Sequence, residues 1–281
     1  MTTVLVTGAA GYVGRHVVTA LLERGVAVRA VVRPGSRSDV DPRADVVALD
    51  VLAPDADLDA LLPDPVDAVV HLAWQDGFNH QAPSHVARLS DHYRLLTALV
   101  DRGVPRVAIL GTMHEVGYWE GAIDEHTPTD PRSLYGVAKD ALRRATLLGL
   151  ADRAEVQWLR CFYITGDDRR NQSIFTRLLE AADRGQREFP FTSGVNRYDF
   201  IDVADLGRQI AVVVTTPGVT GVVNCCSGDP RSLGEMVEDF IARHDLGITL
   251  QYGAFPDRPY DSPGVWGDAT RIHEILAADA R

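Results

Sequence analysis

The residues whose types and spacing most clearly suggest chemistry are Tyr135 and Lys139, four positions apart. On a helix this spacing puts two side chains one turn apart on the same face. An ammonium group placed there can lower the pKa of a phenol, usually about 10, because its positive charge stabilises the phenolate. Lys139 is the only lysine among the 28 basic residues of the chain. The pair predicts a proton-transferring tyrosine; the alternative is two ordinary residues on a half-buried helix.

A glycine-rich turn near the start of the chain provides the second chemical signal. Residues 3–7 form an apolar run typical of a buried parallel strand, and an amphipathic helix extends to Leu22. Three glycines spaced G-x-x-G-x-x-G lie between them. Such glycines let the backbone approach a pyrophosphate, and the helix N-terminus offers free N–H groups to it. We therefore expect a dinucleotide to contact Gly8, Gly11, Tyr12, Val13 and Gly14.

The end of the second strand, residues 26–32, indicates which dinucleotide is bound. An acidic residue there binds the ribose 2′-hydroxyl of NAD, whereas an arginine accommodates the 2′-phosphate of NADP. Arg33 follows the strand with Ser36 close behind, and no carboxylate occurs before Asp39. We therefore expect NADP(H); the alternatives are NAD(H) and a solvated arginine loop. At the end of the third strand, Asp50 is placed to meet the adenine ring.

The order of expected elements predicts how these residues are positioned. Strands alternate with helices up to residue 163, which predicts an α/β fold with a doubly wound, Rossmann-like parallel sheet. The polar loop 75–84 follows the fourth strand, and ligands bind at that edge of such sheets. We expect a dinucleotide-binding domain of residues 1–163 and about 198–226. A small discontinuous α/β substrate lobe is expected at about 164–197 and 227–281.

Composition narrows the class of protein. The net charge of −11 over 281 residues argues against a nucleic-acid surface. No apolar run approaches membrane-spanning length, so no membrane association is expected. The first residues enter a strand pattern directly, which predicts no signal peptide. Three cysteines without zinc-type spacing favour a reduced cytoplasmic protein with neither a disulfide framework nor a metal site.

Several motifs in order resemble the extended short-chain dehydrogenase/reductase family, whose members act largely on nucleotide-linked sugars. They are Thr7 to Gly14, Asp50-Val51, His71-Leu72-Ala73 and Tyr135-x-x-x-Lys139, and the resemblance covers nearly the whole chain. It implies that the dinucleotide also contacts Asp50, Val51, Leu72, Ala73, Tyr135 and Lys139. It further implies a homodimer formed through the helices expected at 84–102 and 135–150.

The family also carries a Ser or Thr about two dozen residues before its tyrosine. Thr112 lies 23 residues before Tyr135 and is therefore implied as the third catalytic residue. In the implied chemistry a hydride moves between the nicotinamide and a sugar carbon. Tyr135 transfers the proton on oxygen, Lys139 holds the ribose and lowers the pKa of the tyrosine, and Thr112 hydrogen-bonds the same oxygen.

Departures from the family pattern narrow the reaction. Met113 and His114 stand where the 4,6-dehydratases of the family carry Asp and Glu, and methionine cannot shuttle a proton. The segment Gly111 to Gly121 is similar to reductases of dTDP-4-keto-6-deoxyhexoses, in particular those forming dTDP-6-deoxy-L-talose. We therefore expect NADPH-dependent reduction of the 4-keto group of a nucleotide-linked, preferably dTDP-linked, 4-keto-6-deoxyhexose.

Three alternatives to this function are a nucleotide-sugar 4-epimerase with tightly bound NAD, an aldehyde or ketone reductase unrelated to sugars, and a non-catalytic dinucleotide-sensing protein.

For the sugar nucleotide, Arg258 opens an Arg-x-x-Asp motif that resembles the diphosphate-binding motif of the family. Arg197 resembles a second such arginine, shifted by one position, and Tyr163 replaces the usual asparagine of a substrate contact. Each arginine is alternatively a surface salt bridge. The expected substrate-binding residues are Trp74, Gln75, His114, Tyr163, Arg197 and Arg258.

Overall fold

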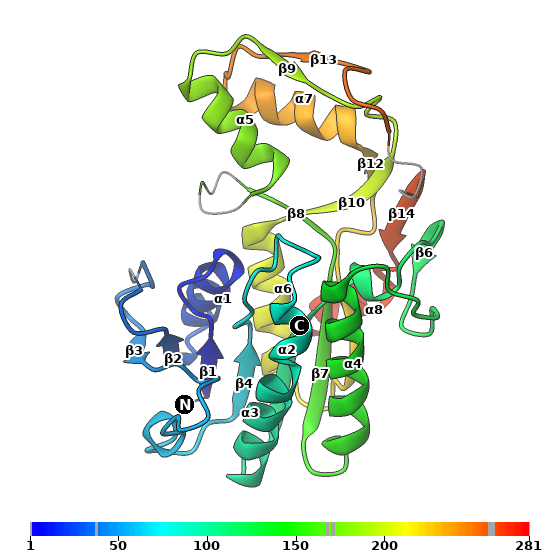
Figure 1. The fold of residues 1–281 in the computed structure, drawn as a ribbon. Coiled ribbons are helices and arrows are strands. Elements are labelled where there is room, and N and C mark those ends of the chain that lie inside the picture. The colour runs from blue at the N-terminus through cyan, green and yellow to red at the C-terminus, as the bar shows by residue number, and fades with distance from the viewer. Residues whose placement is uncertain (1, 37–38, 167–168, 170–171, 258–261, 281) are drawn as a thin grey trace.

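The computed structural model of the chain describes residues 2–36, 39–166, 169, 172–257 and 262–280 (Figure 1). Its centre is a seven-stranded sheet in the order β11-β7-β5-β4-β1-β2-β3, in which every neighbouring pair is parallel. The strands are β1 (Thr3–Thr7), β2 (Ala27–Val32), β3 (Asp45–Ala48), β4 (Ala68–His71), β5 (Arg106–Thr112), β7 (Glu155–Cys161) and β11 (Gly221–Cys225). From β1 the chain adds β2 and β3 on one side of the sheet and then β4, β5 and β7 on the other. This reversal of strand order confirms the predicted doubly wound α/β fold.

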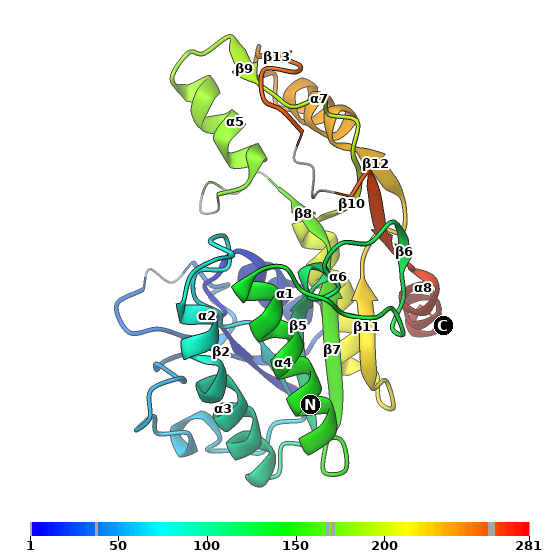
Figure 2. The same cartoon turned by 45° about the vertical axis from the view of Figure 1, so that its right-hand side comes forward.

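Helices cover both faces of this sheet (Figure 2). They are α1 (Tyr12–Glu23), α3 (Leu89–Asp101), α4 (Leu134–Gly149) and α6 (Val203–Thr215). In β1, Val4 and Val6 join the core that contains α1 and α6, whereas Leu5 joins the core that contains α3 and α4. Because side chains alternate across a strand, an uninterrupted apolar run fills both cores.

The remaining helical segments are α2 (Ser84–Ala87), α5 (Ile174–Asp183), α7 (Leu233–Arg243), α8 (Thr270–Asp279) and the 3₁₀ turns η1 (Asp59–Leu61) and η2 (Met113–Glu115). Helix α8 packs against α6 and β11. Across the described ranges, no helix combines the length and the apolar character needed to span a membrane.

A second sheet lies at the carboxyl ends of the main strands. It contains β6 (Gly121–Ile123), β8 (Tyr163–Thr165), β10 (Arg197–Asp202), β12 (Pro230–Ser232) and β14 (Gly264–Gly267). Beyond it, Figure 1 shows α5 and α7 with the short pair β9 (Glu188–Pro190) and β13 (Thr249–Gln251). We expected residues 198–226 to belong to the dinucleotide domain. Within that range β11 joins the main sheet, whereas β10, among the described strands, pairs only with strands of the second sheet. The exact division into domains stays a prediction.

A buried carboxylate connects the two sheets. Asp199, on β10, is completely buried. One of its oxygens accepts from the backbone N–H of Ser227 at 2.8 Å and from the Ser227 hydroxyl at 2.7 Å. The other accepts from the N–H groups of Gly228 at 2.9 Å and Gly267 at 3.1 Å. Asp199 therefore holds the loop after β11 and the end of β14 against β10.

Replacing this carboxylate should destabilise the protein strongly. Asp199→Ala leaves several buried N–H groups without an acceptor, and we expect the free energy of unfolding to fall by about 3 kcal/mol or more. The control Asp229→Ala removes an exposed carboxylate two residues after Ser227, and a change within about 0.5 kcal/mol is expected. Urea unfolding measures both variants. Equal stability of the two variants would contradict this role of Asp199.

Candidate active site

The fold brings the three expected catalytic residues together at the carboxyl edge of the main sheet. Thr112 is the last residue of β5, and Tyr135 lies in the first turn of α4. The helix begins after Ser133, whose hydroxyl accepts from the N–H of Gly136 at 3.1 Å. The Tyr135 hydroxyl hydrogen-bonds the Thr112 side chain, and Lys139 follows one turn later.

The pKa of Tyr135 differs from what the sequence suggested. Burial raises it above its usual range, with a further contribution from Cys161, and the hydrogen bond to Thr112 offsets only part of this. Lys139 is not among the causes of this shift: burial lowers its own pKa to about 7, so the amine, 5.8 Å from the centre of the Tyr135 ring, is already neutral at the raised pKa of Tyr135. Tyr135 is therefore a neutral phenol that carries a proton.

Lys139 is almost completely buried, with 3% of its surface exposed. Its Nζ donates to the carbonyl oxygen of Leu110 at 2.7 Å and lies 3.7 Å from the centre of the Trp74 indole. Burial lowers the pKa of Lys139 to about 7, although Cys161 and Glu115 act in the opposite direction. The predicted substrate residue Trp74 is thus in direct contact with Lys139.

Three histidines lie around the Tyr135 ring, and the ring of His85 is 5.2 Å from it. His80 stacks on it at 5.1 Å with an interplanar angle of 13°, and the backbone carbonyl of His80 accepts from the Tyr135 N–H at 3.0 Å. His114 lies edge-on to His80 at 4.4 Å and 6.2 Å from Tyr135. Burial lowers the pKa of His80, and it lowers that of His114 to about 3. The imidazoles of His80 and His114 are therefore neutral at physiological pH.

Glu115 is a positioning residue whose role sequence reasoning missed. Its side chain is completely buried. Oε1 accepts from the N–H of Thr112 at 3.3 Å, from Trp158 Nε1 at 2.9 Å and from Arg160 Nε at 3.2 Å. Oε2 pairs with Arg143 Nε at 3.0 Å. The T-x-x-E spacing of Thr112 and Glu115 forms a capping box, which was the available signal.

The glycine turn packs directly on the end of β4. Gly8 has a φ of +70°, and a Cβ there would lie 2.7 Å from the backbone nitrogen of Ala73. A Cβ on Gly14 would lie 2.1 Å from the carbonyl oxygen of Gly8. The N-cap residue of α1 is Gly11, which has no side chain to cap the helix. The first turn of α1, which the structure describes throughout, contains no acidic residue. The N–H groups of this turn suit a pyrophosphate, and Ala73 and its neighbour Leu72 lie beside them.

The residues expected at the adenosine end follow β2 and β3. Arg33 and Ser36 are both exposed, and the Ser36 hydroxyl donates to the Arg33 carbonyl at 2.6 Å. Asp50 accepts from the N–H of Leu52 at 3.2 Å, and Val51 is buried. These residues follow β2 and β3, which lie on the opposite side of β1 from β5, the strand that carries Thr112.

The other expected substrate residues are more dispersed. Tyr163, on β8, packs against Tyr198 at 4.4 Å and lies 6.4 Å from His114, so it borders the site. Gln75 is exposed in the loop after β4. The Arg197 guanidinium donates to the carbonyl of Pro230 at 2.7 Å, at the start of β10. Arg258 lies outside the described residues.

This fold and site define an α/β dinucleotide-binding protein with a Thr-Tyr-Lys arrangement. Residues 4–226 match the model of the NAD dependent epimerase/dehydratase family. The chain belongs to this family, which confirms the resemblance to the extended short-chain dehydrogenases/reductases found in the sequence.

Individual relatives are consistent with this membership. The chain is 44% identical over 267 residues to a dTDP-6-deoxy-L-talose 4-dehydrogenase (NAD(+)) of Aggregatibacter actinomycetemcomitans, covering 94% of this chain and 98% of the relative. A crystal structure of a UDP-glucose 4-epimerase superposes with a TM-score of 0.84 at 19% identity, covering 98% of this chain and 92% of that one. MoeE5 in complex with UDP-glucuronic acid and NAD has a TM-score of 0.75 and 26% identity, with the same coverage of 98% and 92%. The expected preference for NADP has no support in these names, two of which specify NAD.

The packing of the glycine turn leads to a prediction for Gly14. In Gly14→Ala the methyl group would overlap the Gly8 carbonyl, so the turn must open; we expect a stability loss of about 1–3 kcal/mol and weaker dinucleotide binding. Gly11→Ala is the matched control for stability, because its Cβ would lie 3.0 Å from the same oxygen. Thermal unfolding and dinucleotide titration measure both effects. A Gly14→Ala protein as stable as Gly11→Ala would contradict the account of the turn.

Proposed function

We propose that this protein reduces the 4-keto group of a nucleotide-linked 4-keto-6-deoxyhexose, with a dTDP-linked sugar preferred and a nicotinamide dinucleotide as the hydride source. The reverse reaction oxidises the corresponding 4-hydroxyl group. The observation that carries the proposal is the placement of Thr112 at the carboxyl end of β5 with Tyr135 and Lys139, one turn apart, on α4. The 44% identity to a dTDP-6-deoxy-L-talose 4-dehydrogenase supports this choice of substrate.

Tyr135 is the proton donor in this proposal. Its raised pKa keeps the hydroxyl protonated at physiological pH, and the hydrogen bond to Thr112 orients it. When bound, the reduced nicotinamide supplies a hydride to the ketone carbon. Tyr135 supplies the proton to the ketone oxygen, so that ketone, hydride and proton together give the alcohol. Thr112 donates to the same oxygen as negative charge develops on it.

Lys139 acts on the charge that the proton transfer leaves behind. An ammonium has three N–H donors, and one of them is directed at the Leu110 carbonyl. Its positive charge stabilises the tyrosinate that forms when Tyr135 gives up its proton. The remaining donors are available to the ribose of the dinucleotide.

The surroundings of Thr112 support reduction over dehydration. Met113 is buried with 5% of its surface exposed, and it has no proton to exchange. The neighbouring His114 has a pKa of about 3 because of its burial, so it is a poor acid-base group at neutral pH. A sugar 4-epimerase remains the competing activity, since the fold is shared with epimerases.

We include two finer features in the proposal. NADP(H) is preferred over NAD(H), on the ground that Arg33 is exposed directly after β2. The protein forms a homodimer through the helices α3 and α4, where Val137 and Leu148 are exposed by 43% and 86%. Apolar side chains so exposed on one helix suit a protein interface.

The activity is tested with dTDP-, UDP- and GDP-linked 4-keto-6-deoxyhexoses and both reduced dinucleotides. We expect stoichiometric dinucleotide oxidation, fastest with the dTDP-linked ketone. Tyr135→Phe should lower kcat by at least about 100-fold with dinucleotide affinity nearly unchanged, because only the proton is lost. Tyr93→Phe, which removes a phenol on α3, should retain full activity. Turnover that persists in Tyr135→Phe, or tightly bound NAD without net consumption, would refute the proposal.

The role of Arg33 is tested separately. Arg33→Ala should raise the KM for NADPH about 10-fold or more and leave that for NADH unchanged, because only NADPH carries the 2′-phosphate. Arg43→Ala is the control, since Arg43 already pairs with Asp41 at 2.7 Å. Steady-state kinetics with each dinucleotide provide the measurement. An unchanged NADPH/NADH ratio would exclude Arg33 as the ligand of the 2′-phosphate.

A further inference from the structure

The contact between Lys139 and Trp74 is the most unusual feature of the site. The ammonium lies over the indole at 3.7 Å from its centre. Such a cation–π contact is attractive, and most strongly so where water is excluded. Trp74 comes from the loop after β4, 65 positions before Lys139 in the sequence, so the fold alone creates the pair.

The indole plane is fixed by two histidines. Trp74 Nε1 donates to His85 Nδ1 at 3.0 Å. Because an indole nitrogen only donates, His85 Nδ1 must accept, and its Nε2–H therefore donates to the carbonyl of Asn79 at 2.9 Å. His92 stacks on the indole at 4.3 Å with an interplanar angle of 17°. These contacts fix the orientation of the Trp74 indole although the residue lies in a loop.

His92 is held in turn by a hydrogen bond to His71. Its Nδ1 forms a hydrogen bond with His71 Nε2 at 2.9 Å, in which one of the two nitrogens donates, and His71 Nδ1 is 2.8 Å from the hydroxyl oxygen of Thr7. Burial lowers the pKa of His71 to about 3 and that of His92 to about 2, and the charge of Lys139 adds to both effects. The rings of Trp74, His92 and His71 are therefore uncharged, and their contacts connect Lys139 to Thr7 at the end of β1.

The other groups near Lys139 do not replace this contact. The Cys161 thiol, on β7, is neutral at physiological pH because burial raises its pKa to about 11. Glu115, on η2, is already paired with Arg143 and Arg160. On α4 itself, the Tyr135 phenol is neutral. Among the described residues around the ammonium, the Leu110 carbonyl and the indole face thus make the closest favourable contacts.

We propose that Trp74 is the positioning residue of Lys139, holding its ammonium in the charged form beside Tyr135. The proposal deepens the function proposed above and depends on it for its catalytic meaning. It assigns to Trp74 a contact with the lysine instead of the substrate contact expected from sequence. Without the indole, the buried lysine is more easily deprotonated, and the tyrosinate loses its cationic partner.

The single lysine allows a direct test that needs no substrate. Protein grown with lysine labelled with ¹³C at Cε gives one lysine signal, whose pH titration reports the pKa of Lys139. We expect Trp74→Leu to lower that pKa by about 0.4 to 1.5 relative to the wild type. Trp74→Phe, which retains an aromatic face, should restore most of the difference. In the wild type, the protons on Cε should be shifted upfield by the ring current of the indole.

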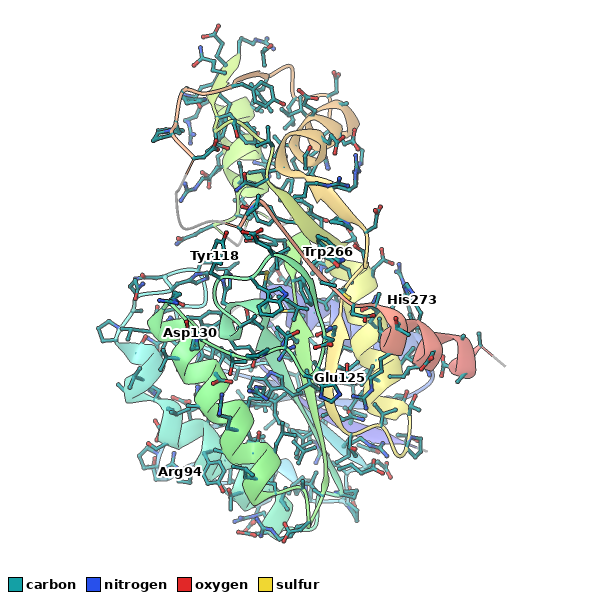
Figure 3. The ribbon with its side chains drawn as sticks, turned by 90° about the vertical axis from the view of Figure 1, so that its right-hand side faces the viewer. Arg94, Tyr118, Glu125, Asp130, Trp266 and His273 are labelled. Carbon is teal, nitrogen blue, oxygen red and sulfur yellow. The ribbon has the colours of Figure 1, made fainter. Side chains whose placement is uncertain are left out.

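Trp266→Leu is the control for loss of an indole elsewhere. Figure 3 shows Trp266 on β14, on the side of the molecule that carries α8, and the pKa of Lys139 should not change in this variant. An equal pKa in Trp74→Leu and the wild type would overturn the proposal. If Trp74→Leu fails to fold, protons on Cε without an upfield shift in the wild type would overturn it as well. Because neither measurement uses a sugar, a failure here is distinct from failure of the proposed reaction.

Discussion

The active-site edge depends on the buried carboxylate of Glu115, which receives a backbone N–H, an indole N–H and two guanidinium groups. Removing one partner from a buried ion pair is costly, because the other charge is left without compensation. Here the backbone partner belongs to Thr112, the residue that bonds the Tyr135 hydroxyl. The same carboxylate therefore stabilises the interior beneath β5 and sets the position of Thr112, the expected catalytic threonine.

Above this carboxylate most of the titratable groups are neutral. His71, His92 and His114 all have strongly lowered pKa values because they are buried, and Tyr135 is neutral for the same reason. Lys139 is the exception, with a pKa lowered to about 7. In such surroundings one ammonium has a large effect on a developing negative charge, since little water screens it. A site of this kind suits a reaction in which one proton follows one hydride.

The position of the lobe relative to this edge depends on a second carboxylate, Asp199. It gathers N–H groups from two distant parts of the chain, around Ser227 and Gly267. Strand β10 thereby joins the second sheet to the end of β11, and Tyr163 is brought alongside His114 through β8. The part of the site around Tyr163 and His114 is thus assembled from segments that are far apart in the sequence.

Local patterns in the sequence sufficed for the features that are themselves local. The apolar run of β1, the glycines of the turn and the spacing of Tyr135 and Lys139 predicted a buried strand, a tight turn and a shared helical face, and the alternation of strands with helices predicted the doubly wound fold. Tertiary structure alone decided where the Lys139 ammonium points, because Trp74 reaches it from the loop after β4. It also decided that the pKa of Tyr135 is raised, since desolvation depends on all the atoms packed around a group and not on its neighbours in the chain.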